Sequence, residues 1–164
     1  MPLVLGIDPG TKFTGWGLVA AEGSRLRLVA AGRISARAKA PLAERLRQVY
    51  VGLRDIIKEH SPDVAAVEDV FYAKNVRSAV RLGHVRGVAL LAAAEAGLEV
   101  FEYPPAEIKM SVVGYGRAEK DQVGLMVRHL LGIKTKLTED AADALAAAVC
   151  HAHRSPDLPK RRGK

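Results

Sequence analysis

Four carboxylates stand where a fold could gather them into one acidic site: Asp8, Glu68, Asp140 and Asp143. The first two each end a short apolar run with the length of a buried strand, and the last two are three residues apart at the start of an alanine-rich stretch. Hard oxygen ligands without cysteine suit Mg²⁺ or Mn²⁺ rather than Zn²⁺. Two such ions about 3.5–4 Å apart can activate water and stabilise a leaving oxygen. The four residues are therefore predicted to hold Mg²⁺ or Mn²⁺ against a phosphate backbone.

Two of these carboxylates also have an ordinary structural explanation. Asp8 precedes a Pro-Gly turn whose amides it could cap, and Asp140 could favour the positive end of a helix dipole. Glu68 is harder to explain in this way, because a glutamate that ends an apolar strand is costly unless it is solvated, paired or bound to metal. Strand alternation puts Asp69 on the opposite side, where a structural or solvated role is expected. Asp143 is flanked by alanines, which let a helix backbone pack closely on a sheet.

Basic and aromatic residues near these acids are candidates for binding DNA. Lys109 and Lys120 could neutralise charge that develops on a phosphate, although solvated surface lysines would look the same. Arg77, Arg81 and His84 recur at helical spacing and form one basic face. The aromatic pair after Glu68 could stack on an unpaired base or wedge a junction, with burial in the core as the alternative. The predicted DNA-binding residues are Phe71, Tyr72, Lys74, Asn75, Arg77, Arg81, Lys109 and Lys120.

The bulk composition favours one basic domain that binds a polyanion. The chain has 164 residues, a net charge of +7 and a pI near 9.8. Residues 154–164 hold five basic residues and one acid, and are expected to form a basic, disordered tail behind a domain spanning 1–153. A tail that only aids solubility is the alternative. Cys150 is the only cysteine, so no disulfide framework is expected. No apolar run approaches the roughly 18–20 residues of a membrane helix, and a cytoplasmic location is the default expectation.

Apolar runs, turn residues and helical periodicity predict five strands and five helices. The strands are expected at 3–8, 15–20, 26–34, 64–68 and 98–103. The helices are expected at 41–60, 75–96, 106–112, 117–131 and 138–151. The first three strands are close enough for an antiparallel meander, and the fourth has the apolar composition of a central parallel strand. This order predicts an α/β fold with a five-stranded mixed sheet, helices on both faces and a site at the strand ends.

Several segments occur in an order and spacing typical of one nuclease family. They are Gly6-Ile7-Asp8-Pro9-Gly10 with Thr14-Gly15-Trp16-Gly17, Val67-Glu68-Asp69-Val70-Phe71 with Ala73-Lys74-Asn75, Lys109 and Val113-Gly114-Tyr115-Gly116 with Ala118-Glu119-Lys120, and Asp140-Ala141-Ala142-Asp143-Ala144-Leu145-Ala146. With them, the chain from residue 3 to residue 153 resembles the RuvC crossover-junction endodeoxyribonucleases, the bacterial Holliday junction resolvases. Any one motif is weak, but four in this order are specific. Asp69 and Met110 depart from the family pattern.

The resemblance implies an RNase H-like fold and a homodimer that resolves four-way DNA junctions in recombination and repair. Two sites in a symmetric dimer would make paired symmetric nicks with 5′-phosphate and 3′-hydroxyl ends. The implied partners are the branch-migration proteins RuvA and RuvB. The implied site has two metal ions held by Asp8, Glu68, Asp140 and Asp143, Lys109 and Lys120 near the scissile phosphate, and Phe71 stacked on a base.

Three other classes of protein share parts of this pattern. An actin-like or sugar-kinase-like ATPase also opens with a strand, an aspartate and a Gly-Thr turn, but it needs two such lobes and a second phosphate loop. A related RNase H-like nuclease acting on RNA or on DNA ends would use the same metal chemistry. A non-catalytic junction-binding module is the third alternative, and the presence of all four carboxylates argues against it.

Overall fold

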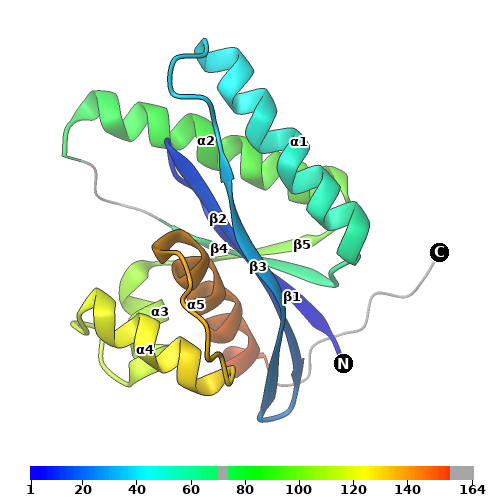
Figure 1. Ribbon diagram of the computed structural model, residues 1–164, viewed down its shortest axis with the longest axis vertical. Coiled ribbons are helices and arrows are strands. Elements are labelled where there is room, and N and C mark those ends of the chain that lie inside the picture. The colour runs from blue at the N-terminus through cyan, green and yellow to red at the C-terminus, as the bar shows by residue number, and fades with distance from the viewer. Residues whose placement is uncertain (70–73, 156–164) are drawn as a thin grey trace.

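A computed structural model describes residues 1–69 and 74–155 of the chain (Figure 1). Its strands are Leu3–Asp8 (β1), Phe13–Glu22 (β2), Arg25–Ser35 (β3), Val64–Glu68 (β4) and Glu99–Tyr103 (β5). Its helices are Leu42–His60 (α1), Val76–Glu95 (α2), Pro105–Val113 (α3), Lys120–Leu130 (α4) and Glu139–Arg154 (α5). The predicted mixed sheet is confirmed, because the strand order is β3-β2-β1-β4-β5, with an antiparallel β1–β2–β3 meander and parallel β4 and β5.

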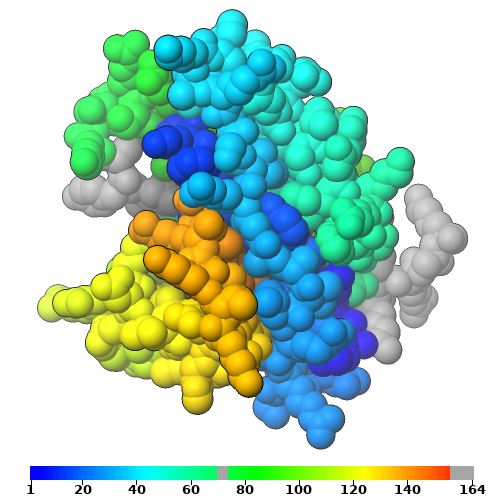
Figure 2. Space-filling model, in the orientation of Figure 1, coloured from blue at the N-terminus to red at the C-terminus, as the bar shows by residue number. Residues whose placement is uncertain are grey.

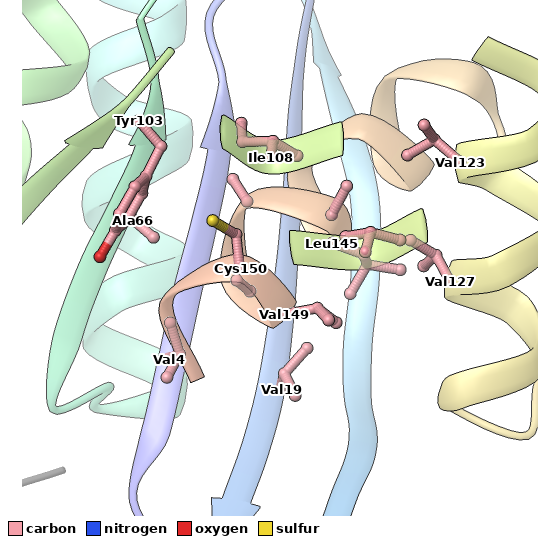
Figure 3. Packing of buried hydrophobic residues seen from close by; sticks show 14 of the residues in the cluster. Val4, Val19, Ala66, Tyr103, Ile108, Val123, Val127, Leu145, Val149 and Cys150 are labelled. Carbon is pink, nitrogen blue, oxygen red and sulfur yellow. The ribbon is translucent and has the colours of Figure 1, made fainter. Parts of the chain in front are cut away.

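Helices cover both faces of the sheet, as the sequence predicts. Figure 1 shows α1 and α2 on one face and α3, α4 and α5 on the other. Each face has its own buried apolar cluster, because strand side chains alternate between the two sides. In Figure 3, Leu145 and Val149 of α5 lie between the sheet, which contributes Val19, and helix α4, which contributes Val127. Helix α5 is therefore the central element of its layer.

Glycines and alanines let α5 lie directly on the strands. A Cβ placed on Gly15 of β2 would come within 2.0 Å of the carbonyl oxygen of Asp140, and one on Gly17 would collide with Leu145. Most of the α5 residues that are buried against the sheet are alanines. This close contact fixes the first turn of α5 above the strand ends, where the four carboxylates were predicted to meet.

Some predicted boundaries are wrong by a few residues. The fourth helix starts at Lys120 rather than at 117, because Glu119 and Gln122 form a capping box in which each side chain accepts a hydrogen bond from the other's backbone amide. Strand β2 begins two residues earlier and ends two residues later than predicted. Helix α5 continues to Arg154, and residues 156–164 of the predicted tail lie outside the described residues.

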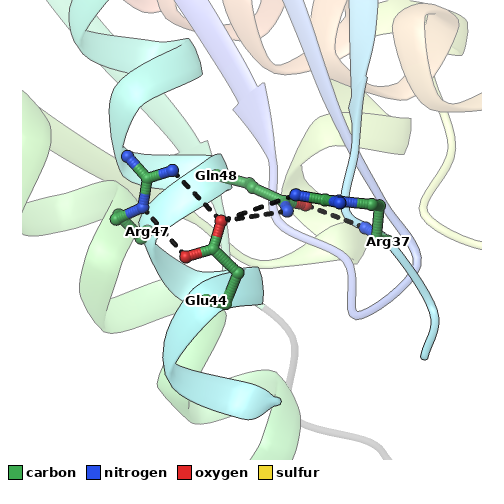
Figure 4. A network of polar contacts seen from close by, with 4 residues as sticks. All are labelled: Arg37, Glu44, Arg47 and Gln48. Atoms are coloured by element: carbon green, nitrogen blue, oxygen red, sulfur yellow. Dashed lines mark hydrogen bonds and ion pairs between the residues drawn. The ribbon is translucent and has the colours of Figure 1, made fainter. Parts of the chain in front are cut away.

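The start of α1 is tied to the segment that follows β3. Glu44 pairs with Arg47 at 3.0 Å and lies 3.9 Å from Arg37, while Gln48 accepts a hydrogen bond from the Arg37 amide (Figure 4). This network links the first two turns of α1 to the residues that follow β3. None of the helices in residues 1–69 and 74–155 has the length and apolar character needed to span a membrane.

Candidate active site

The register of the sheet brings Asp8 and Glu68 together at the carboxyl ends of two neighbouring strands. Strands β1 and β4 are parallel neighbours, and Ile7 pairs with Val67, so the next residues along, Asp8 and Glu68, end the two strands side by side. Asp143 reaches this edge from the first turns of α5. A cavity of about 320 Å³ opens here, lined by Asp8, Glu68, Pro105, Ile108, Lys109, Lys120, Val123, Asp143 and Ala146. Three of the four predicted carboxylates and both predicted lysines therefore share one cavity.

The pKa values of two of these acids, Asp8 and Asp143, are raised because the acids lie close together and are shielded from water. Burial, followed by the charges of Glu68 and Asp143, raises the pKa of Asp8 from 3.8 to about 9. Burial also raises the pKa of Asp143, to about 6, against the opposing effect of Lys120. Without an added positive charge, these acids cannot all be ionised together at neutral pH.

Lys120 supplies part of that positive charge. Its ammonium lies 3.1 Å from the carboxylate of Asp143 and also pairs with Glu139. Although burial lowers the pKa of Lys120, the contacts with Glu139 and Asp143 outweigh burial and leave that pKa raised. Lys120 is therefore a fixed cation at the mouth of the cavity.

Asp140 lies outside the cavity lining. Its carboxylate is 3.7 Å from the guanidinium of Arg33 on β3, and it makes the smallest of the charge contributions to the raised pKa of Asp8. Within the described residues, no three His, Cys, Asp or Glu side chains converge into a finished metal-binding group. Two of the four carboxylates are instead paired with cations of the chain, Asp140 with Arg33 and Asp143 with Lys120.

The donor chemistry nevertheless fits a hard divalent cation. The residues that line the cavity include three carboxylates but neither cysteine nor histidine. Carboxylate oxygens are the ligands that Mg²⁺ and Mn²⁺ take. A divalent cation would also neutralise the negative charge of the half-buried, neighbouring acids Asp8 and Glu68. Asp69, on the opposite side of the strand end, pairs instead with Arg86 of α2 at 3.1 Å, which agrees with its predicted structural role.

Six of the eight predicted DNA-binding residues lie in two places. Lys109 and Lys120 line the cavity. Lys74, Asn75, Arg77 and Arg81 are exposed at the start of α2, where Asn75 caps the helix by accepting a hydrogen bond of 2.9 Å from the Ser78 amide. Phe71 and Tyr72 lie outside the described residues.

Two residues near this site, Glu139 and Arg33, were not predicted from the sequence. Glu139 directly precedes Asp140 and holds Lys120, a pairing that depends on how α4 and α5 pack. Arg33 is far from every motif in the sequence, and only the register of β2 and β3 brings it to Asp140. Spacing along the chain carries no signal for either contact.

Comparisons of the sequence point to one family. The family model described as "Crossover junction endodeoxyribonuclease RuvC" matches residues 4–151. A relative of that name from Syntrophotalea carbinolica is 54% identical over 150 residues, which cover 92% of this chain and 93% of the relative. Another, from Acinetobacter baumannii, is 49% identical over 160 residues, which cover 98% of this chain and 88% of the relative.

Solved structures agree. The structure of T. thermophilus RuvC in complex with Holliday junction substrate matches with a TM-score of 0.90 and 34% identity, over 95% of this chain and 96% of that one. The yeast mitochondrial Holliday junction resolvase Ydc2 matches with a TM-score of 0.66 at 13% identity, over 92% of this chain and 77% of that one, which is a likeness of fold alone.

Proposed function

The chain belongs to the RuvC family of crossover junction endodeoxyribonucleases, and on that premise we propose that it resolves four-way DNA junctions by hydrolysing phosphodiester bonds. The observation that carries the proposal is the cavity in which Asp8, Glu68 and Asp143 face Lys109 and Lys120. Metal-assisted hydrolysis of a phosphodiester requires acidic residues that bind the metal ions. It is also helped by basic residues that neutralise the phosphate, and this cavity contains both kinds of residue.

We propose that Asp8, Glu68, Asp140 and Asp143 together hold two Mg²⁺ or Mn²⁺ ions. When bound, the ions would supply an activated water and stabilise the leaving oxygen of the phosphodiester. The raised pKa of Asp8 supports this assignment, since a divalent cation relieves the repulsion among the acids. For all four to serve as ligands, the ions compete with Arg33 for the carboxylate of Asp140 and with Lys120 for that of Asp143.

Basic side chains of the protein would contact the DNA around the metal site. Lys109 and Lys120 line the cavity and would neutralise charge that develops on the scissile phosphate. Lys120 exchanges its contact with Asp143 for the phosphate while Glu139 still holds it. Exposed cations at the start of α2, among them Lys74, Arg77 and Arg81, would bind the backbone of a junction arm, and Phe71 and Tyr72 would stack on bases at the crossover. Asn75 would contact DNA in addition to capping α2.

Paired nicks with 5′-phosphate and 3′-hydroxyl ends require two sites, and we propose a homodimer formed through α2. One face of that helix leaves Val76 80%, Val80 54% and Leu91 53% exposed. Gly83 and Gly87 fall on the same stripe, and a Cβ at either would meet nothing within 4 Å. Apolar side chains around exposed glycines form a surface that a second copy of the helix can approach closely.

The dimer proposal is tested by the oligomeric state. Val80→Glu is expected to shift the protein from dimer to monomer in sedimentation equilibrium, because it buries a charge in the interface. Leu125→Glu is the matched control, since Leu125 is 63% exposed on α4, away from the proposed face. A wild-type monomer would reject the dimer, and a dimeric Val80→Glu variant would reject this face.

We also propose that the protein works with RuvA and RuvB, in the cytoplasm where chromosomal junctions form. Co-purification of the three proteins on a junction, compared with a linear duplex of equal length, tests the partnership. Failure to assemble on the junction would reject it.

The substrate proposal is tested by cleavage and binding in parallel. A synthetic four-way junction and a linear duplex of the same sequence are incubated with the protein and Mg²⁺ or Mn²⁺. We expect paired, ligatable nicks in the junction alone. Binding without cleavage under either ion would favour a junction-binding module, and cleavage of RNA hybrids or DNA ends in preference to junctions would favour a related nuclease.

A further inference from the structure

One row of residues across the sheet joins the proposed metal site to a cation on β3. Asp8 pairs with Gly15 of β2, and Gly15 pairs in turn with Arg33 of β3. Directly opposed residues in antiparallel strands point to the same face. The face is the one that carries α5, because a Cβ on Gly15 would meet the backbone of Asp140. Arg33 therefore points to the same side as Asp8, two strands or about 10 Å away.

Arg33 has two different contacts at this place. Its guanidinium is 3.7 Å from the carboxylate of Asp140 and 3.9 Å from the centre of the Phe13 ring. Figure 2 shows the orange start of α5 lying against the blue strands on this face. Lys12 lies over the same ring, 5.4 Å from its centre. The Arg33 side chain is 41% exposed, so DNA can reach it.

The two contacts respond differently to a divalent cation. An ion at Asp140 competes with Arg33 for the carboxylate, whereas the cation–π contact with Phe13 is unaffected. Loss of the ion pair costs little in itself, because partly exposed ion pairs contribute little to stability. Arg33 would then remain against Phe13 at the rim of the site, and Asp140 would no longer neutralise its charge.

We propose that Arg33 is a further DNA contact, which binds a phosphate a few nucleotides from the scissile one once a divalent cation has taken Asp140. The inference rests on the proposed function. Arg33 lies on β3, on one side of the β1 strand that carries Asp8, whereas Lys109 lies on α3, which follows β5 on the other side of β1. A strand crossing the metal site would therefore meet cations on both sides. The planar guanidinium donates two parallel hydrogen bonds to a phosphate, which suits it to this contact. Asp140 thereby couples ion binding to DNA binding.

The test compares Arg33→Gln with Arg27→Gln, which removes the same charge from the same strand. Arg27 is exposed and pairs with Ala20 of β2, far along the strand from the site. Junction affinity is measured by fluorescence anisotropy at several salt concentrations, in EDTA and in Ca²⁺, under conditions where a gel shows the junction uncut. Thermal melting of both variants checks that they fold.

In Ca²⁺, Arg33→Gln is expected to weaken junction binding about tenfold and to reduce the slope of log K against log salt by about one. In EDTA, its loss should be no more than about threefold, because Asp140 already holds the arginine. Phe13→Leu should give a smaller loss in Ca²⁺ while keeping the charge. Arg27→Gln should match the wild type within about twofold in both conditions.

Two results would overturn the inference. Equal affinities of Arg33→Gln and Arg27→Gln in Ca²⁺ would mean that Arg33 does not contact DNA. An equal loss for Arg33→Gln in EDTA and in Ca²⁺ would mean that Asp140 does not control the contact. In either case, wild-type junction cleavage would leave the proposed function standing, whereas a wild type that neither binds nor cuts junctions would reject the function itself.

Discussion

A Cβ on Gly6 would lie 1.9 Å from the carbonyl oxygen of Ala144, so the backbone of α5 rests directly on the backbone of β1. Gly6 and Asp8 point to the same face of β1, two residues apart. The contact therefore sets the height of α5 above the strand that carries Asp8. Any residue larger than glycine at this position has to lift the helix, and Asp143 with it.

Gly6→Ala is expected to destabilise the protein by about 1–3 kcal/mol and to reduce junction cleavage, because the backbone of α5 cannot move aside without carrying Asp143 away. Urea unfolding and a cleavage assay measure the two effects. Gly124→Ala on α4 is the control, since a Cβ there meets nothing within 4 Å. It should be neutral or stabilising, as is usual for alanine in a helix. A Gly6→Ala variant as stable as the control would contradict this account of the packing.

Asp8→Asn is expected to stabilise the ion-free protein, increasingly as the pH rises. The raised pKa of Asp8, about 9, means that the folded state keeps a proton that the unfolded chain loses near its ordinary value of 3.8. Stability from this group is therefore complete below pH 4 and is lost as the pH rises towards 9. An amide has no proton to lose, so at pH 8.5 the variant should gain roughly 0.5–2 kcal/mol.

Thermal melting in EDTA at pH 5 and pH 8.5 measures this difference. Asp121→Asn, which changes an exposed acid of α4, serves as the control and should follow the wild type. Mg²⁺ should raise the melting temperature of the wild type more than that of Asp8→Asn. A variant that melts with the wild type at both pH values would show that the acids do not repel one another as inferred.

Tyr103 and His151 form a buried pair on the α5 face of the sheet. The hydroxyl lies 2.7 Å from Nδ1 of the imidazole, and Nε2 has no protein partner among the described residues. Tyr103→Phe would leave both ring nitrogens unpaired, at a cost of about 1–3 kcal/mol. Tyr50→Phe removes a hydroxyl from an exposed pair with Glu95 and should cost less than about 0.5 kcal/mol.

Burial lowers the pKa of His151, so the folded protein resists protonation that the unfolded chain accepts. Stability is therefore expected to fall as the pH drops below about 6.5. His151→Gln should flatten that dependence in denaturant titrations between pH 5 and pH 7. An unchanged pH slope in this variant would assign the acid sensitivity to other groups.

Much of the fold could be predicted because its signals are local. Apolar runs, turns and periodicity place every strand and helix to within a few residues, and the end of β4 at Glu68 is predicted to the residue. The start of α4 is missed because a glutamate N-cap with a glutamine three residues on is a weaker signal than the apolar periodicity that extends past it. A cap is decided by side-chain hydrogen bonds that periodicity does not contain.

The structure brings five of the predicted site residues to one cavity, but most of their contacts could not be predicted. Asp8 and Glu68 meet because parallel strand ends share an edge, which follows from the order of elements. The pairing of Asp140 with Arg33 and of Lys120 with Glu139 depends on register and on the packing of α5. These contacts join residues distant in the chain, so spacing has no information about them.

Glu68 and Asp69 are adjacent acids on opposite sides of one strand end, and they offer the most direct test of the proposed site. Glu68 lines the cavity, and Asp69 pairs with Arg86 behind it. The measurement is the rate of junction cleavage in Mg²⁺ for Glu68→Gln and Asp69→Asn, with junction binding measured alongside. We expect Glu68→Gln to bind the junction but to cut it at least about 100-fold more slowly, since it loses a proposed metal ligand, and Asp69→Asn to stay within about tenfold of the wild type. Cleavage by Glu68→Gln at the rate of Asp69→Asn would contradict the account, because the chemistry would then lie outside this cavity.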